Sequence, residues 1–222
     1  DSLMLNAEGR RVADTWDPAK DEAAGEQCRA YGAANVMRIP GRLHVTWQDD
    51  TTLKIETDAG TQTRLLHFQD TPAGEPSWQG HSAAEWERAA GRGAQGGNLK
   101  VVTTNLKAGY IRKNGAPYSA KTTVTEYFDR NTMPNGDVWF TVTTKVDDPV
   151  YARGTYLTTT DFKKLADASG WNATFGMHRA DFVDFLAAAL PAHIVNTGHR
   201  AIGFEQHGGQ RRAFQHFHYD EN

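Results

Sequence analysis

The sequence predicts a mainly β protein, an antiparallel β-barrel preceded by short helices. Between residues 41 and 162, apolar and polar residues alternate with a period of two, which is the pattern of strands with one buried face. Gly, Asn and Asp residues interrupt the alternation about every ten residues, a spacing typical of sandwiches and barrels. The segment holds seven or eight such strands, enough to close a small barrel.

The strands follow one another with short turns. The first three form an antiparallel meander, since only three or four turn residues separate them. Asn135-Gly136 is a strong hairpin signal between two later strands. Residues 1–40 contain only short helical pieces. The expected strands are 43–48, 53–57, 61–68, 99–106, 120–128, 137–146 and 156–162.

The pattern divides the chain into a barrel domain, residues 1–172, and a C-terminal appendage, residues 173–222. The appendage begins with an amphipathic helix over 178–190, which Pro191 ends, and continues as strand and a histidine-rich tail. His216 and His218 would share one side of a strand as a weak zinc pair. Because no third ligand is near them in the sequence, we expect no metal site.

Composition excludes several classes of protein. A formal net charge of -3 gives no reason to expect nucleic acid as a partner. No apolar run is long enough to span a membrane. Cys28 is the only cysteine, so no internal disulfide forms. The oligomeric state does not follow from the sequence.

The Gly-rich segment 91–96 matches the dinucleotide-binding fingerprint by letter only. That motif needs a strand before it and a helix after it, so that a pyrophosphate meets a helix N-terminus. Here the predicted order is reversed, because a helical turn precedes the segment and a strand follows it. We therefore expect a flexible loop and no cofactor.

Residues 76–87 concentrate chemistry-bearing side chains midway along the chain, with two tryptophans around one histidine. Ser82 and Glu85 have capping-box spacing, which predicts a short helical turn. We expect Trp78, His81 and Trp86 to lie together at or just under the barrel mouth. The alternative for the tryptophans is that they belong to the core or plug the barrel.

Three residues are candidates for acid–base catalysis: His81, Glu126 and Tyr127. His81 would be a general acid or base, because imidazole titrates near neutral pH. The alternative is that it hydrogen-bonds a buried carbonyl and holds the loop in place. Glu126 would instead be a surface residue if its strand turns it outward.

The predicted function is binding of a small apolar or aromatic molecule in the lumen or mouth of the barrel. The alternative is a cofactor-independent isomerase, cyclase or lyase that uses the acid–base residues in the same pocket. The barrel fold alone does not choose between them. The candidate ligand-binding residues are Trp78, Trp86, His67, Trp47 and Trp139.

Several short motifs carry a family resemblance over residues 6–172. They resemble a family of small, mostly exported bacterial proteins with a lipocalin-like β-barrel, which implies that fold and a periplasmic or secreted location. The chain starts without Met, as a processed product would, and a cytoplasmic location is also compatible with the sequence. The family implies no catalytic residue set. The motifs are Trp16-Asp17-Pro18, Cys28, Met37-Arg38-Ile39-Pro40, Ser77-Trp78-Gln79-Gly80-His81-Ser82, Glu85-Trp86-Glu87, Val101-Val102-Thr103-Thr104-Asn105, Thr125-Glu126-Tyr127-Phe128 and Asp167-Ala168-Ser169-Gly170-Trp171-Asn172.

Residues 176–205 are similar to an internal fragment of flavin monooxygenases of the salicylate hydroxylase type. The matching residues are Gly176 to Phe182, Gly198-His199-Arg200 and Gly203-Phe204-Glu205. In that family, the arginine that matches Arg179 lies near the flavin. No βαβ unit with a phosphate-binding fingerprint precedes the segment, so we expect that this chain binds no FAD.

Overall fold

A computed structural model describes residues 3–88, 97–164, 174–176, 201–207 and 210–215. The chain divides into two compact units, residues 1–178 and 179–222. Within the second unit, β12 (Ala201–His207) pairs with β13 (Gln210–Gln215). The expected helix over 178–190, the Gly-rich segment 91–96 and the His216–His218 pair lie outside the described residues.

The first unit contains two short helices, three 3-10 turns and eleven strands among its described residues. None of the described helices has the length and apolar character needed to span a membrane. In chain order the elements are α1 (Ala7–Asp14), α2 (Pro18–Ala23), η1 (Gln27–Tyr31), η2 (Val36–Arg38), β1 (Arg42–Asp49), β2 (Thr52–Thr57), η3 (Ala59–Thr61), β3 (Gln62–His67), β4 (His81–Arg88), β5 (Gly97–Thr104), β6 (Gly109–Tyr110), β7 (Pro117–Tyr118), β8 (Thr123–Thr132), β9 (Val138–Asp147), β10 (Tyr156–Lys164) and β11 (Thr174–Gly176).

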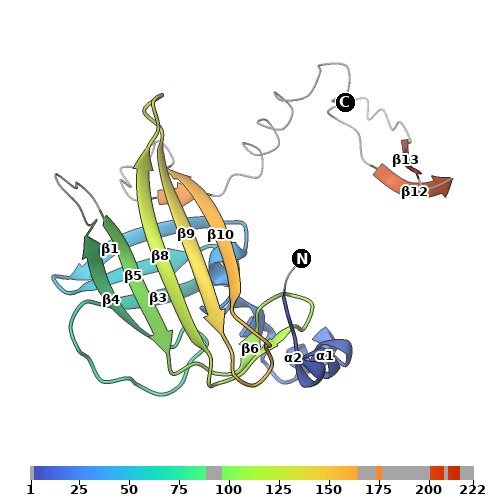
Figure 1. Cartoon of the computed structure of the whole chain (residues 1–222), viewed down its shortest axis with the longest axis horizontal. Coiled ribbons are helices and arrows are strands. Elements are labelled where there is room, and N and C mark those ends of the chain that lie inside the picture. Colours follow the sequence, from blue (N-terminus) through green and yellow to red (C-terminus); the bar gives the residue numbers. More distant parts are fainter. Residues whose placement is uncertain (1–2, 89–96, 165–173, 177–200, 208–209, 216–222) are drawn as a thin grey trace. The chain divides into compact units, whose positions relative to one another are not determined.

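Nine strands form one strongly curled sheet in the order β1-β11-β10-β9-β8-β5-β4-β3-β2, and β2 pairs back to β1 (Figure 1). All neighbours are antiparallel except β3 and β4, where Leu66 lies opposite Ser82 in a parallel pair. The prediction of a mainly β, barrel-like fold is confirmed, and its likeness to lipocalins stays a prediction. The ring closes through β11, which lies beyond residue 172, the predicted end of the barrel domain.

The expected helical turn at residues 82–85 is wrong, because this segment belongs to β4. Eight consecutive residues of β4 pair with β5, from His81 opposite Thr104 to Arg88 opposite Gly97. Ser82 and Ala84 are buried, whereas Ala83 and Glu85, which alternate with them, are exposed. This period of two, supported by pairing along the whole strand, outweighs a local capping-box spacing.

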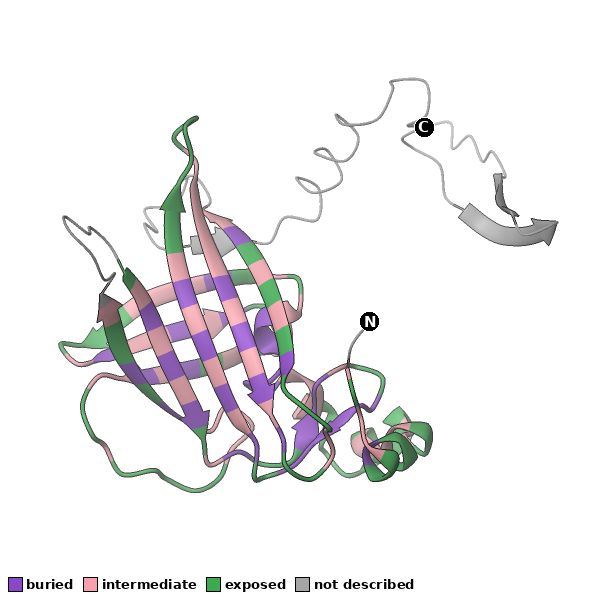
Figure 2. Cartoon of the chain, viewed as in Figure 1, coloured by how far each residue is buried: buried purple, intermediate pink, exposed green. Residues whose placement is uncertain are grey.

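Burial alternates along the long strands, as Figure 2 shows for β8 and β9. In β8, Val124, Glu126 and Phe128 are buried and face the interior. Residues 33–34 and 106–118 cover one end of the barrel. This closed end is packed by the buried residues Ala33, Ala34, Leu106, Ile111, Tyr118, Val124, Val146 and Tyr156.

An ion pair lies inside the barrel between β3 and β8. Arg64 donates from Nη1 to Glu126 Oε1 at 3.0 Å and from Nη2 to Oε2 at 2.5 Å, and both side chains are 0% exposed. Arg64 Nη2 also donates to Thr103 Oγ1 at 3.3 Å, and Thr103 bonds Ser82 Oγ at 2.8 Å. Four strands therefore meet at one buried polar cluster, in which bidentate geometry offsets part of the cost of desolvating two charges.

We predict that removing either member of this pair alone strongly destabilises the fold. Arg64→Met or Glu126→Leu leaves one buried charge uncompensated, which costs about 3–5 kcal/mol in the free energy of unfolding. The double variant removes both charges and should recover most of that loss. Urea denaturation of the three variants and the wild type measures these differences.

Arg42→Met is the matched control, because Arg42 pairs with Asp58 at 2.7 Å but their side chains are 66% and 52% exposed. Such surface pairs contribute about 0–1 kcal/mol. Equal losses for Arg42→Met and Arg64→Met would contradict the structural role given to the buried pair.

Candidate functional site

Three aromatic rings form a continuous row across β1, β3 and β4. The ring of Phe68, which follows β3, lies 5.4 Å from that of Trp47 in β1 and 5.5 Å from that of Trp86 in β4. The planes of Phe68 and Trp86 differ by 27°, so these two rings are stacked. Trp47 is 54% exposed and Trp86 60% exposed. We call Trp47, Phe68 and Trp86 the aromatic row.

The aromatic row occupies interior-facing positions at the open end of the barrel. Leu43 and Trp47 lie on the same face of β1, yet exposure rises from 3% to 54% between them. Ser82 and Trp86 likewise share a face of β4, and exposure rises from 2% to 60%. This rise in exposure along two interior faces places the row where the barrel opens.

Further aromatic side chains continue the apolar wall from β8 to β10. The ring of Phe140 lies 5.5 Å from that of Phe128 and 6.5 Å from that of Phe162. Phe128 and Phe162 are almost completely buried. These rings therefore pack in the apolar core of the barrel, which also encloses the Arg64–Glu126 pair.

The tryptophans predicted to bind ligand lie in three different places. Trp47 and Trp86 are in the aromatic row. Trp139 faces outward from β9, because its neighbours Val138 and Phe140 face the interior. Trp78 precedes β4 near the closed end, where its carbonyl accepts from Ala33 N at 2.9 Å and Lys107 Nζ lies 5.7 Å from its ring. The expected grouping of Trp78 with Trp86 at the mouth is therefore not seen.

His67 and His81 face each other on the outer surface of the parallel pair β3–β4. Their rings are stacked, 5.2 Å apart and 17° from parallel. His67 Nδ1 is buried and has no hydrogen-bond partner among the described residues. Burial, together with the charge of His81, lowers the pKa of His67, and Asp49 opposes this shift.

The acid–base candidates occupy opposite faces of the sheet. Glu126 is 0% exposed inside the barrel, so the alternative that its strand turns it outward is wrong. Its carboxylate is bound to Arg64. Tyr127 follows Glu126 in β8 and faces outward, as does His81, which precedes the buried Ser82. The three candidates therefore do not meet around one volume.

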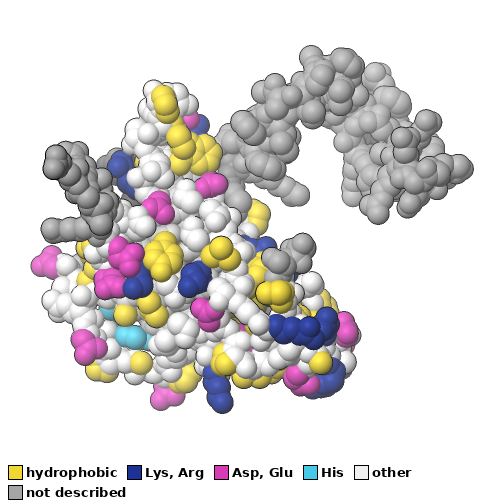
Figure 3. Space-filling model, viewed as in Figure 1, with side chains coloured by type: hydrophobic (Ala, Val, Ile, Leu, Met, Phe, Trp, Pro, Cys, Tyr) yellow, Lys and Arg dark blue, Asp and Glu magenta, His cyan; other side chains and the backbone are white. Residues whose placement is uncertain are grey.

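The outer surface in view carries charges of both signs among hydrophobic side chains. Figure 3 shows acidic and basic side chains intermingled over the face in view. On the outer face of β4 and β5, Lys100 Nζ lies 2.8 Å from Glu85 Oε1 and 3.4 Å from Glu87 Oε1. Glu85 and Glu87, on either side of Trp86, are therefore both paired with Lys100 on this outer face.

Sequence reasoning missed Phe68 and Arg64. Phe68 lies two residues after Leu66 on the interior face of the third strand, and that alternation was the available signal. Nothing in the sequence near Arg64 identifies Glu126 as its partner, since 62 residues separate them.

We predict a stability change that comes from His67. Because the pKa of His67 is lower in the folded state than its ordinary value of about 6.5, the unfolded chain binds a proton more readily there. The contribution to stability is present above about pH 6.5 and is lost as the pH falls through that value.

The measurement is the free energy of unfolding at pH 7.5 and 5.5 for the wild type and for His67→Gln. The wild type should lose more stability than the variant across this interval. Equal losses of stability in the wild type and in His67→Gln would show that the surroundings of His67 do not oppose its protonation.

Comparison of the chain with protein-family models, curated proteins and solved structures gives no significant match. Both sequence resemblances described above therefore stay predictions.

Proposed function

We propose that the protein binds a small apolar or aromatic molecule at the mouth of its barrel. The observation that carries the proposal is the aromatic row, in which two tryptophans more than half exposed flank a phenylalanine on interior-facing positions. A flat, apolar ligand placed against these rings would remove their surface from water.

The energetics support a ligand at this place. Burying a large apolar side chain is worth about 1.5–3 kcal/mol, and favourable ring–ring geometry adds about 0.5–1.5 kcal/mol. Trp47 and Trp86 are 54% and 60% exposed. More than half of the surface of each side chain is therefore still in contact with water and can be buried by a ligand. Stacking with Phe68 fixes their orientation in advance, so little side-chain entropy remains to be lost on binding.

The alternative, an isomerase, cyclase or lyase, has less support. General acid–base catalysis requires its groups within hydrogen-bond reach of one substrate. His81 and Tyr127 lie on the opposite face of the sheet from Glu126, and Glu126 is already bound to Arg64. No specific contact among the described residues favours catalysis by these three.

The test uses N-phenyl-1-naphthylamine, a neutral apolar fluorophore whose emission rises when it leaves water. We predict saturable binding to the wild type. Trp86→Ala should weaken binding about tenfold, equivalent to ~1.4 kcal/mol, since it removes one ring of the row. Trp47→Ala should have a similar effect. Fluorescence titration gives the dissociation constants.

Trp139→Ala is the matched control, because it removes the same side chain from the outer face of β9. It should leave the dissociation constant unchanged. Absence of saturable binding to the wild type would overturn the proposal, and so would an equal loss for Trp139→Ala and Trp86→Ala.

A further inference from the structure

The two faces of the β3–β4 junction carry two ring pairs of different character. On the outer face, the imidazoles of His67 and His81 are stacked with their centroids 5.2 Å apart. On the interior face, Phe68 stacks on Trp86 at 5.5 Å, and this contact belongs to the aromatic row. His67 and Phe68 are neighbours in the sequence, so their side chains leave the same stretch of backbone toward opposite faces. A movement of that backbone therefore changes both ring pairs together.

The strands β3 and β4 meet over a short distance. Their parallel pairing joins Leu66 to Ser82 and His67 to Ala83, whereas β4 pairs with β5 along its whole length. Among the described residues, the part of β4 nearer the mouth, residues 84–88, has no strand partner on the side of β3. This junction therefore depends on side-chain contacts more than the junction between β4 and β5 does.

The junction is anchored at its deeper end. Ser82 Oγ bonds Thr103 Oγ1 at 2.8 Å, and Arg64 of β3 donates to the same Thr103 oxygen at 3.3 Å. Nearer the mouth, the N–H of Phe68 donates to a carbonyl in the β1–β2 turn at 2.9 Å. Phe68 therefore moves with β2 and β3, whereas Trp86 moves with β4 and β5. An opening of the junction at the mouth separates the two rings.

The surroundings of His67 oppose its protonation. Its Nδ1 is buried and has no hydrogen-bond partner among the described residues. In the neutral ring this nitrogen can stay without a proton, but an imidazolium carries an N–H on both nitrogens. A buried N–H without an acceptor is costly, and a second imidazolium at His81 would repel the first. The stacked arrangement is therefore less stable at acid pH than at neutral pH.

The charged groups that neighbour His67 leave its Nδ1 without an acceptor. Asp49, at the end of β1, favours a proton on His67, but its Oδ1 already accepts from Thr51 N at 2.8 Å and from Thr51 Oγ1 at 3.0 Å. The remaining charged groups on the neighbouring elements are paired with each other or exposed to water: Lys54 with Glu56 at 3.0 Å on β2, and Asp70 and Glu75 in the loop between β3 and β4.

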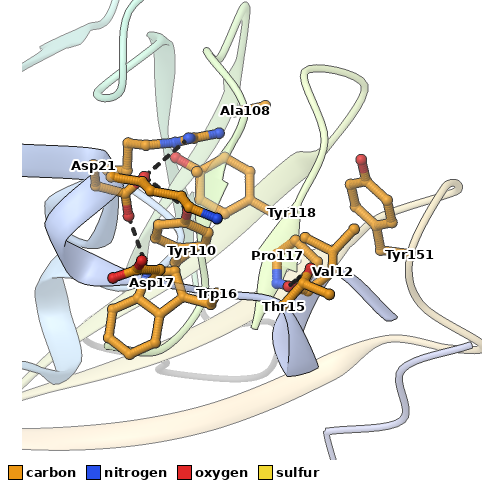
Figure 4. Close-up of a pocket in the computed structure, with 13 residues that line it drawn as sticks. Val12, Thr15, Trp16, Asp17, Asp21, Ala108, Tyr110, Pro117, Tyr118 and Tyr151 are labelled. Atoms are coloured by element: carbon orange, nitrogen blue, oxygen red, sulfur yellow. Dashed lines mark hydrogen bonds and ion pairs between the residues drawn. The ribbon is translucent and has the colours of Figure 1, made fainter. Parts of the chain in front are cut away.

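The other hollow of the first unit offers no comparable group. Figure 4 shows this hollow, of about 300 Å³, between the N-terminal helices and the β6–β7 hairpin. None of the described residues that line it is a histidine. Its carboxylate Asp21 is only 13% exposed and already accepts from Trp16, Arg29 and Tyr110. A molecule bound in this hollow would not respond to the histidine pair, so pH dependence distinguishes it from one bound at the mouth.

We propose that protonation of the stacked histidine pair opens the β3–β4 junction, breaks the Phe68–Trp86 contact and releases the ligand of the barrel mouth at acid pH. At neutral pH, the uncharged imidazoles hold β3 against β4 and keep the aromatic row continuous. This inference rests on the binding proposed at the mouth. Coupling between two sites is reciprocal, so a ligand held across the row must in turn lower the affinity of the histidine pair for protons.

The test measures the dissociation constant of N-phenyl-1-naphthylamine by fluorescence titration at pH 7.5 and 5.0, since this weakly basic probe stays neutral at both. The wild type should bind about fivefold more weakly at pH 5.0, which is the lower end of typical coupling between sites. His67→Gln has no ring to protonate and should lose this difference. His44→Gln is the matched control and should keep it, because His44 lies on the outer face of β1 and pairs with Glu56 at 3.2 Å.

A second measurement separates coupling from a general loss of folding at acid pH. Saturating probe should move the protonation of His67, followed by the ¹H–¹³C signals of the histidine rings, to lower pH. The inference is overturned if the wild type binds the probe equally at both pH values, if the probe leaves the titration of His67 in place, or if His67→Gln keeps the wild-type difference. Failure of the wild type to bind at pH 7.5 would overturn the proposed function, and this inference with it.

Discussion

The arrangement of the barrel interior depends on the ion pair between Arg64 and Glu126. Two fully buried charges are tolerable only when they are held in bidentate contact, and here the contact joins β3 to β8 across the lumen. Thr103 and Ser82 extend it to β5 and β4. The four strands must therefore keep one register, since a shift of one residue would turn each polar side chain to the opposite face.

This polar layer separates two apolar regions with different roles. Toward the closed end, side chains such as Leu106, Ile111 and Tyr118 are almost completely buried. On β1 and β4, the interior-facing side chains become more exposed along the strand and end in the aromatic row. An apolar surface that the fold leaves open to water at a defined end is the physical basis for the binding that we propose there.

The period of two and the turn residues made the strands predictable, because both are local properties of the sequence. The same alternation places Trp47 on an interior face, as the structure shows. Partners in space were not predictable. Nothing local in the sequence shows that Glu126 binds Arg64, 62 residues away, or that β4 runs through the segment where a helical turn is expected. An extended strand carries His81 and Trp86 apart, whereas a helical turn would have kept them close.

The central claim is that apolar molecules meet the chain at the aromatic row. The most direct measurement is the ¹H–¹⁵N spectrum of the six tryptophan indole groups with and without saturating N-phenyl-1-naphthylamine, assigned by single substitutions. The account predicts that the indole signals of Trp47 and Trp86 shift while those of Trp78 and Trp139 stay in place. Shifts at Trp78 or Trp139, with Trp47 and Trp86 unchanged, would contradict it.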